Sequence, residues 1–300
     1  MKKILLSVVC LVMVGMQSVN AQLVIAALHH EGNVTTYPST NLKGALDAAV
    51  KGDTLYLSEG IFDGFTVEKP IAIIGAGQST VIAGDINVSS ENSVEEGLLL
   101  SGLNVTNIHF RGVVMGARVL QCKIPGFCEF SGTDDASYNN IEIISSEIDR
   151  FIPSDKINYM SVVASKIRSL NNGVAENGNI VFLNCNIRYC YGDNINFQSC
   201  IVSYPNSGVF HNCLCYGSSS LMYDCYELIV EVLDDDLNSI MSDDELKAAG
   251  YLGPDNTWVG INGGQVKFSL VMPIVQVVEH NIEVDQAEKK LKVTLKLGNK

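Results

Sequence analysis

The sequence predicts an all-β chain folded as a parallel β-helix, a solenoid of stacked strands. A short motif recurs down its middle: an apolar residue, two residues, a small residue, one residue and a second apolar residue. The small residues lie 24, 19, 20, 15 and 13 positions apart, a period too short for a pair of helices. The repeats are also rich in β-forming residues. Each inward residue should therefore lie over its equivalent one coil below, about 4.8 Å away.

Six copies of the motif carry this prediction. They are Val119–Cys122–Ile124, Ile143–Ser146–Ile148, Val162–Ser165–Ile167, Phe182–Cys185–Ile187, Phe197–Cys200–Val202 and Phe210–Cys213–Cys215. An earlier copy is expected at Val105–Ile108–Phe110. The side chains expected in the core are Val162, Phe182, Phe197 and Phe210, with Ser165, Cys185, Cys200 and Cys213. The short last intervals leave the register after residue 185 open.

The N-terminus is typical of a secretory signal peptide. Two lysines precede an apolar run from Ile4 to Met16, and small residues end at Ala21. We expect residues 1–21 to be removed and the protein to be exported, to the periplasm, the outer surface or the extracellular space. An anchored lipoprotein would need Cys10, which follows Val9 rather than a small residue.

Composition limits the partners. Hydrophobic residues make up 47% of the chain and charged residues 18%, so a substantial core is expected. The net charge of −13 argues against nucleic acid and anionic membranes as partners. No later stretch is long and apolar enough for a transmembrane span. The oligomeric state is left open.

Residues 39–51 predict a short amphipathic helix that ends at Gly52. Strands are expected at 53–57, 61–62, 65–67 and 71–74, with a turn at Asp63-Gly64. Further along, Ser242 and Glu245 form a capping box for a short helix through Ala249. Alternation over 274–296 predicts a terminal hairpin.

The segments Leu42–Ala49, Gly52–Leu55, Lys69-Pro70 and Ile73–Gly77 together resemble the entry of right-handed parallel β-helices in the pectin-lyase-like superfamily. In that family the helix caps the open end of the solenoid. Residues 253–264 resemble the closing segment of secreted β-helix proteins of Bacteroidetes-type bacteria, with Asn256 where Gly is usual. The resemblance implies a β-helix over 22–225, and a closing segment with a β hairpin over 226–300.

The recurring cysteines are interpreted as core residues. Cys185, Cys200 and Cys213 share one inward slot with Ser146 and Ser165. Thiolate ligands of a metal must converge in a tetrahedron, which one column of a sheet does not offer. We expect reduced, stacked thiols, with a disulfide between coils as the alternative. No metal and no cofactor are predicted.

Charged residues follow the small residues on the outer face. These positions are Lys123, Glu147, Lys166 and Asn186, then Asp149, Arg168 and Arg188. One coil apart, Glu147 should meet Lys123 and Lys166, and Asp149 should meet Arg168, as cross-strand charge pairs.

The resemblance also implies an enzymatic alternative, because lyases of the superfamily carry a basic residue and calcium-binding carboxylates on one outer face. Lys166, Arg168 or Arg188 could supply the base. Only Glu147 and Asp149 lie nearby, too few oxygen ligands for calcium. The clustered aspartates, Gly-His-Gly and Arg-x-Lys of the hydrolases are missing. No catalytic residue is therefore predicted.

An aromatic group favours glycan binding, because tyrosine faces stack on sugar rings and arginine can bond hydroxyls. The candidate glycan-binding residues are Tyr189, Arg188, Arg168, Lys166, Tyr191 and Tyr204. Ordinary turn packing is the alternative for the tyrosines. The acidic run at 234–236 lacks the alternating spacing of an EF-hand loop and predicts a solvated turn.

These observations favour a secreted, non-catalytic β-helix protein of the cell envelope whose partner is an extended polysaccharide. Two alternatives stay open: a polysaccharide lyase or other carbohydrate-active enzyme, and an adhesin or structural surface protein.

Overall fold

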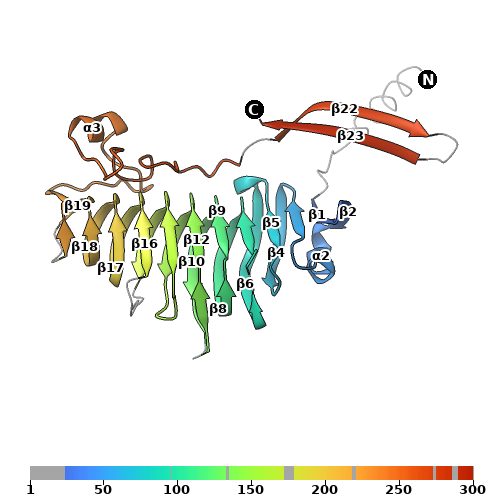
Figure 1. Cartoon of the computed structure of the whole chain (residues 1–300), viewed down its shortest axis with the longest axis horizontal. Helices are drawn as coiled ribbons and strands as arrows, with labels where there is room; N and C mark the ends of the chain where they lie inside the picture. Colours follow the sequence, from blue (N-terminus) through green and yellow to red (C-terminus); the bar gives the residue numbers. More distant parts are fainter. Residues whose placement is uncertain are drawn as a thin grey trace, which may run out of the picture.

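The structure, a computed structural model, is a parallel β-solenoid of about 7 turns in which 54% of the residues are in strands (Figure 1). It describes residues 24–94, 96–132, 135–171, 179–217, 221–272, 275–285 and 290–299. The signal-peptide prediction lies outside the described residues.

The first elements are β1 (Ile25–His30), β2 (Asn33–Pro38), the 3₁₀ turn η1 (Ser39–Asn41), α2 (Leu42–Ala48), β3 (Thr54–Leu57), β4 (Gly60–Val67), β5 (Ala72–Ile74), the 3₁₀ turn η2 (Gly77–Ser79), β6 (Thr80–Val94), β7 (Leu99–Ser101) and β8 (Asn104–Met115). The middle coils contain β9 (Arg118–Leu120), β10 (Lys123–Phe130), β11 (Ser137–Asn139), β12 (Ile141–Ile144), β13 (Glu147–Ile152), β14 (Met160–Val163), β15 (Lys166–Asn171) and β16 (Ile180–Leu183). The last coils contain β17 (Asn186–Gln198), β18 (Ile201–His211), β19 (Leu214–Tyr216), β20 (Met222–Tyr223) and β21 (Tyr226–Leu228).

The N-terminal end is capped, as expected. Strand β1 pairs antiparallel with both β2 and β3 before the parallel ladder begins. Helix α2 buries Leu42 and Ala45 against the first coil. The Lys69 ammonium donates to the carbonyls of Asp47 (2.9 Å) and Ala49 (2.7 Å), which satisfies the helix end. The expected turn at Asp63-Gly64 is instead a register shift inside a continuous β4.

A sharp corner explains the recurring motif. The residue before each small residue has a positive φ: Gln121, Ser145, Ala164, Asn184, Ser199, Asn212 and Asp224 lie between 47° and 54°. The small side chain then forms hydrogen bonds to the backbone at the corner. For example, the Ser165 hydroxyl donates to Val163 O (2.9 Å) and accepts from Ser146 N–H (3.1 Å). Cys200 makes the same contacts through sulfur, with Gln198 O and Cys185 N–H. Serine and cysteine recur because the slot needs a small group that can both donate and accept.

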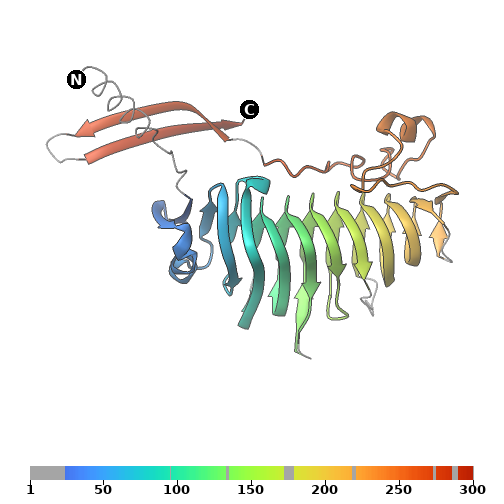
Figure 2. The ribbon, with the colours of Figure 1, turned by 180° about the vertical axis from the view of Figure 1, so that it is seen from behind.

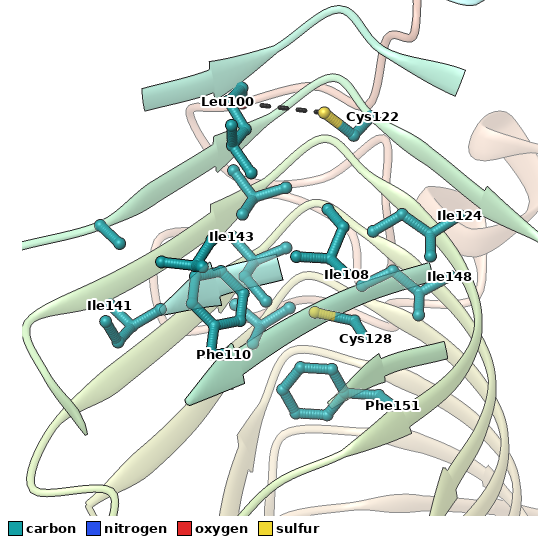
Figure 3. Packing of buried hydrophobic residues seen from close by; sticks show 14 of the residues in the cluster. Leu100, Ile108, Phe110, Cys122, Ile124, Cys128, Ile141, Ile143, Ile148 and Phe151 are labelled. Carbon is teal, nitrogen blue, oxygen red and sulfur yellow. Dashed lines mark hydrogen bonds between the residues drawn. The ribbon is translucent and has the colours of Figure 1, made fainter. Parts of the chain in front are cut away.

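The predicted core is confirmed. Val162, Phe182, Phe197 and Phe210 are register partners in successive coils and are fully buried. Ser165, Cys185, Cys200 and Cys213 are equally buried. The register therefore continues past residue 185 with narrower coils, and the Phe197 and Phe210 rings stack at 4.7 Å. Figure 3 shows the same inward packing in the earlier coils.

One expected rung is wrong. Leu100 pairs with Val119, and Leu103, which follows the positive-φ Gly102, occupies the slot position. Val105, Ile108 and Phe110 are buried, but they lie along the next sides of that coil. The slot prediction missed this copy because it looked for a small residue, and this coil fills the slot with Leu103.

After β21, residues 229–272, here called the closing segment, fold back over the solenoid (Figures 1 and 2). Helix α3 (Asp243–Ala248) begins with the predicted capping box of Ser242 and Glu245. Beyond α3 the chain runs along the corner residues. Its hydrogen bonds there are Gly260 N–H to Ser199 O (2.8 Å), Ser145 Oγ to Lys267 O (3.1 Å) and Gln121 Nε2 to Val271 O (3.0 Å).

The chain ends in an antiparallel hairpin of β22 (Val275–Asp285) and β23 (Lys290–Asn299), a separate two-stranded sheet in the expected region. Within the described part of the chain, no helix has the length and apolar character needed to cross a membrane.

Candidate functional site: the outer face of the solenoid

One outward-facing column has seven register positions from Lys123 onward and is here called the outer column. Its members, in register, are Lys123, Glu147, Lys166, Asn186, Ile201, Leu214 and Tyr226. The column is charged at the first three positions and apolar at the last three. The same repeat position therefore carries charged residues in one part of the solenoid and apolar residues in another.

The apolar end is covered by the closing segment. Ile201 and Leu214 are buried in a cluster with Val232, Leu246 and Val259 from that segment. Asn186, at the boundary, is fully buried. Its amide donates to Leu237 O (2.9 Å) and accepts from Ile261 N–H (3.2 Å). Residues of the closing segment thus supply both the hydrogen-bond partners of Asn186 and the apolar neighbours of Ile201 and Leu214.

The acidic run forms an exposed turn, as expected, and hydrogen bonds fix its conformation. The Asp234 carboxylate accepts hydrogen bonds from the N–H groups of Asp236 (3.0 Å) and Asn238 (2.8 Å). Burial raises the pKa of Asp234, but these hydrogen bonds outweigh it and hold the pKa below its ordinary value. The turn is therefore locally fixed, and its backbone carbonyls point at the solenoid.

Those carbonyls hold the basic residues of the predicted glycan site. Arg188 donates to Leu233 O (3.2 Å) and Asp234 O (2.6 Å), and Lys166 donates to Asp236 O (3.0 Å). Arg188 is 8% exposed and Lys166 7%. Both side chains therefore attach the closing segment to the solenoid, and its backbone carbonyls bind their charged groups.

Lys166 has two more partners. Its ammonium donates to Asn238 Oδ1 (2.7 Å) and lies over the Phe268 ring at 5.0 Å. Burial lowers the pKa of this lysine. Glu147 was expected to form a charge pair with Lys166; it lies in register and acts through its charge, while the ammonium makes its hydrogen bonds to the closing segment.

The other predicted charge pairs are present. Lys123 Nζ lies 3.0 Å from Glu147 Oε1, and Arg168 Nε lies 2.8 Å from Asp149 Oδ1. Arg168 also donates to Asp235 O (3.1 Å). These residues, with Pro125 and the acidic turn, line an open groove of about 480 Å³ beside the closing segment. The groove is polar, and its charges are compensated.

The tyrosines belong to a second column at the next corner, here called the corner column. Its members, in register, are Phe127, Arg150, Ser169, Tyr189 and Tyr204. Tyr189 and Tyr204 stack at 5.0 Å and 15°, and Tyr216 meets Tyr204 edge-on at 5.4 Å. At the other end, Arg150 lies over the Phe127 ring at 5.5 Å. Four rung spacings of about 4.8 Å make this column about 19 Å long.

The structure thus divides the six predicted glycan-binding residues. Tyr189 and Tyr191 are 37% and 46% exposed, and Tyr204 is half-buried between its neighbours. Arg188 and Lys166 lie beneath the closing segment, and Arg168 lies at its edge. The sequence reasoning missed Phe127, Arg150 and Tyr216. Extending the tyrosine register back by three coils would have found Arg150 and Phe127, whereas Tyr216 lies outside that register.

A separate charged cluster lies on the earlier coils. His109 is 7% exposed, with Nδ1 2.9 Å from Glu129 Oε2 and Nε2 3.5 Å from Asp85 Oδ2. Asn107 bridges Asp85 Oδ1 (2.7 Å) and Phe127 N–H (2.9 Å). The imidazole therefore lies between two carboxylates. Among the described residues, no group of three or more His, Cys, Asp or Glu side chains is arranged to hold a metal ion.

Comparison of the chain with protein-family models, curated proteins and solved structures finds no match.

Proposed function

We propose that this chain is an exported β-solenoid protein of the cell envelope, without a catalytic step, that binds an extended polysaccharide along the corner column. The observation that carries the proposal is the exposed Tyr189, which stacks on the half-buried Tyr204 in register with Arg150 and Phe127, with Tyr216 edge-on beside Tyr204. Aromatic faces spaced along one axis suit the faces of successive sugar rings. A solenoid offers such a surface over several coils.

The charges favour a neutral glycan over a polyuronide. The cations near the tyrosines are compensated: Arg188 by the carbonyls of the acidic turn, and Arg168 by Asp149. The chain also carries a net charge of −13. An acidic polymer would meet repulsion at long range and would have to break existing contacts at short range.

Affinity electrophoresis and calorimetry with neutral and acidic oligosaccharides test this proposal. We expect binding of a neutral chain that Tyr204→Ala weakens about three- to tenfold. Tyr56→Ala is the matched control, because Tyr56 is 49% exposed on β3, away from the corner column. Absence of binding across a glycan array, or equal loss in both variants, would favour a structural surface protein instead.

A polysaccharide lyase is the second candidate, in keeping with the resemblance to the pectin-lyase-like superfamily. One observation favours it: the pKa of Lys166 is lowered by burial, and the residue lines the 480 Å³ groove next to Arg168. A lysine with a lowered pKa can serve as a base. Unsaturated products from a polyuronide, detected by ultraviolet absorbance and abolished by Lys166→Ala, would establish this activity.

A further inference from the structure

Three thiols meet where the inner slot ends. Cys225 takes the slot position directly after Cys213, since Tyr226 N–H donates to Cys213 O (2.8 Å) and Leu214 is the register partner of Tyr226. Cys215, two residues along β19, points into the same core. Cys225 donates to Tyr223 O (3.3 Å) and packs against the buried core that contains Cys213 and Cys215.

Exposure separates these thiols. Seven of the eight described cysteines are buried, whereas Cys225 is half-buried. The reason is its place in the fold: β21 pairs only with β19 among the described strands, so no described strand covers the outer side of the last rung. A reagent from solvent can therefore reach Cys225 without opening the solenoid.

The pKa values also distinguish Cys225 from the two buried thiols. Hydrogen bonding with the side chains of Cys213 and then Cys215 lowers the pKa of Cys225. Burial raises the pKa of Cys213, and the hydrogen bond to Cys225 together with burial raises that of Cys215. An accessible sulfur stabilised as the thiolate is the usual attacking group in thiol–disulfide exchange, and a neighbouring buried thiol is the usual resolving group.

We propose that Cys225 is a redox-active thiol and that Cys213 resolves it, so that oxidation joins the last coil to the one before it. The oxidant is a small-molecule disulfide. The Cys225 thiolate attacks one of its sulfurs, the S–S bond breaks, and one thiolate leaves. Cys213 then loses its proton to water and attacks Cys225 Sγ, and the second thiolate leaves. The protein loses two electrons and two protons in total, and the disulfide becomes two thiols.

The geometry accommodates this bond. Neighbouring positions of a parallel ladder are about 4.8 Å apart, which lies inside the range of about 4.4–6.8 Å that disulfides span between Cα atoms. The bond would also secure the strand from which the closing segment departs. Cys200 and Cys185 stay out of the exchange, because they are buried one and two coils deeper than Cys213.

The test uses the full chain, reduced and then exposed to oxidised glutathione. Under native conditions iodoacetamide should label Cys225 at least about tenfold faster than the buried cysteines. Peptide mass spectrometry should then find a transient glutathione adduct on Cys225 and, later, a Cys213–Cys225 disulfide. Cys225→Ser should abolish both products, and Cys213→Ser should trap the adduct. Cys128→Ser, a buried cysteine elsewhere, is the matched control and should change neither.

Equal labelling of all cysteines in the wild-type chain would overturn the proposal even if a variant failed to fold. Adduct formation on another cysteine would overturn it as well. A final disulfide that links Cys225 to Cys215, or that forms in Cys213→Ser, would show that Cys213 is not the resolving group.

Discussion

The two ends of the outer column occupy the same repeat position but face different surroundings. At Lys123 and Glu147 the side chains are partly exposed and neutralise each other across one rung. At Ile201 and Leu214 the side chains are buried beneath the closing segment. Between them, Lys166 and Asn186 bind backbone and side-chain groups of that segment. The inner slot hardly changes over the same coils. The difference teaches that the solenoid repeat determines which residue types fill the core. Contact with the closing segment, or with solvent, determines which residue types occupy the outward positions.

The largest effects should come from the inside and be alike at both ends. Phe110 stacks on Phe130 at 4.5 Å, Phe182 stacks on Phe197 at 5.1 Å, and both are fully buried. We expect Phe110→Ala and Phe182→Ala each to lower the free energy of unfolding by about 3–5 kcal/mol in denaturant titrations. The exposed Ile61→Ala is the control, with a change under about 0.5 kcal/mol. A small effect for one phenylalanine alone would mean that the two halves also differ inside.

The next effect should distinguish the two ends. Leu214→Ala removes buried contacts with the closing segment and should cost about 2–4 kcal/mol. Limited proteolysis should show cleavage within 232–259 before the solenoid is cut. Lys123→Ala removes only a partly exposed ion pair and should cost under about 1 kcal/mol. Similar costs for both variants would contradict the division of the outer column.

Arg188 tests how the closing segment is held. Arg188→Ala leaves the carbonyls of Leu233 and Asp234 without their donor and should cost about 1–3 kcal/mol. Hydrogen exchange should increase first at the acidic turn. Arg118→Ala serves as the matched control, because the Arg118 side chain is 50% exposed and pairs with Glu142 on the surface. If both variants exchange alike, Arg188 does not anchor the segment.

A smaller effect concerns the slot itself, which holds Cys122, Ser146 and Ser165 in the open half and only cysteine in the closed half. Ser165→Ala leaves the buried Ser146 N–H without its acceptor and should cost about 1–2 kcal/mol. Ser165→Cys should recover most of that loss, since Cys200 and Cys213 make the equivalent contacts. Equal stability of the two variants would show that the slot selects for size alone.

Much of the inside could be predicted from the sequence because it is periodic. The spacing of Phe182, Cys185 and Ile187 repeats in the next coil, so the register and the buried set follow from counting. The corner itself could not be predicted. Its positive-φ positions hold Gln121, Ala164 and Asn184 alike, and no single residue type marks them.

The outside was only half predictable. Charge pairs one coil apart, such as Asp149 with Arg168, follow from the same counting. The contacts of the closing segment could not be predicted, because they join residues far apart in the chain, such as Arg188 with Leu233, 45 positions apart, and Gln121 with Val271, 150 positions apart. Such contacts leave no local period. The apolar identities of Ile201 and Leu214 at an outward position were the available signal that something covers them.

The smallest effect should be at Arg168, at the boundary between the two ends. Its guanidinium pairs with Asp149 at 2.8 Å and reaches Asp235 O at 3.1 Å, but the side chain is 41% exposed. Solvent screens such a pair, so Arg168→Ala should cost under about 1 kcal/mol, and the cost should shrink further in high salt. Unfolding titrations at low and high ionic strength measure both quantities. Glycan affinity should not change, because the ligand is assigned to the corner column. A loss of affinity in Arg168→Ala would move the binding site to the outer column and make the groove the functional surface.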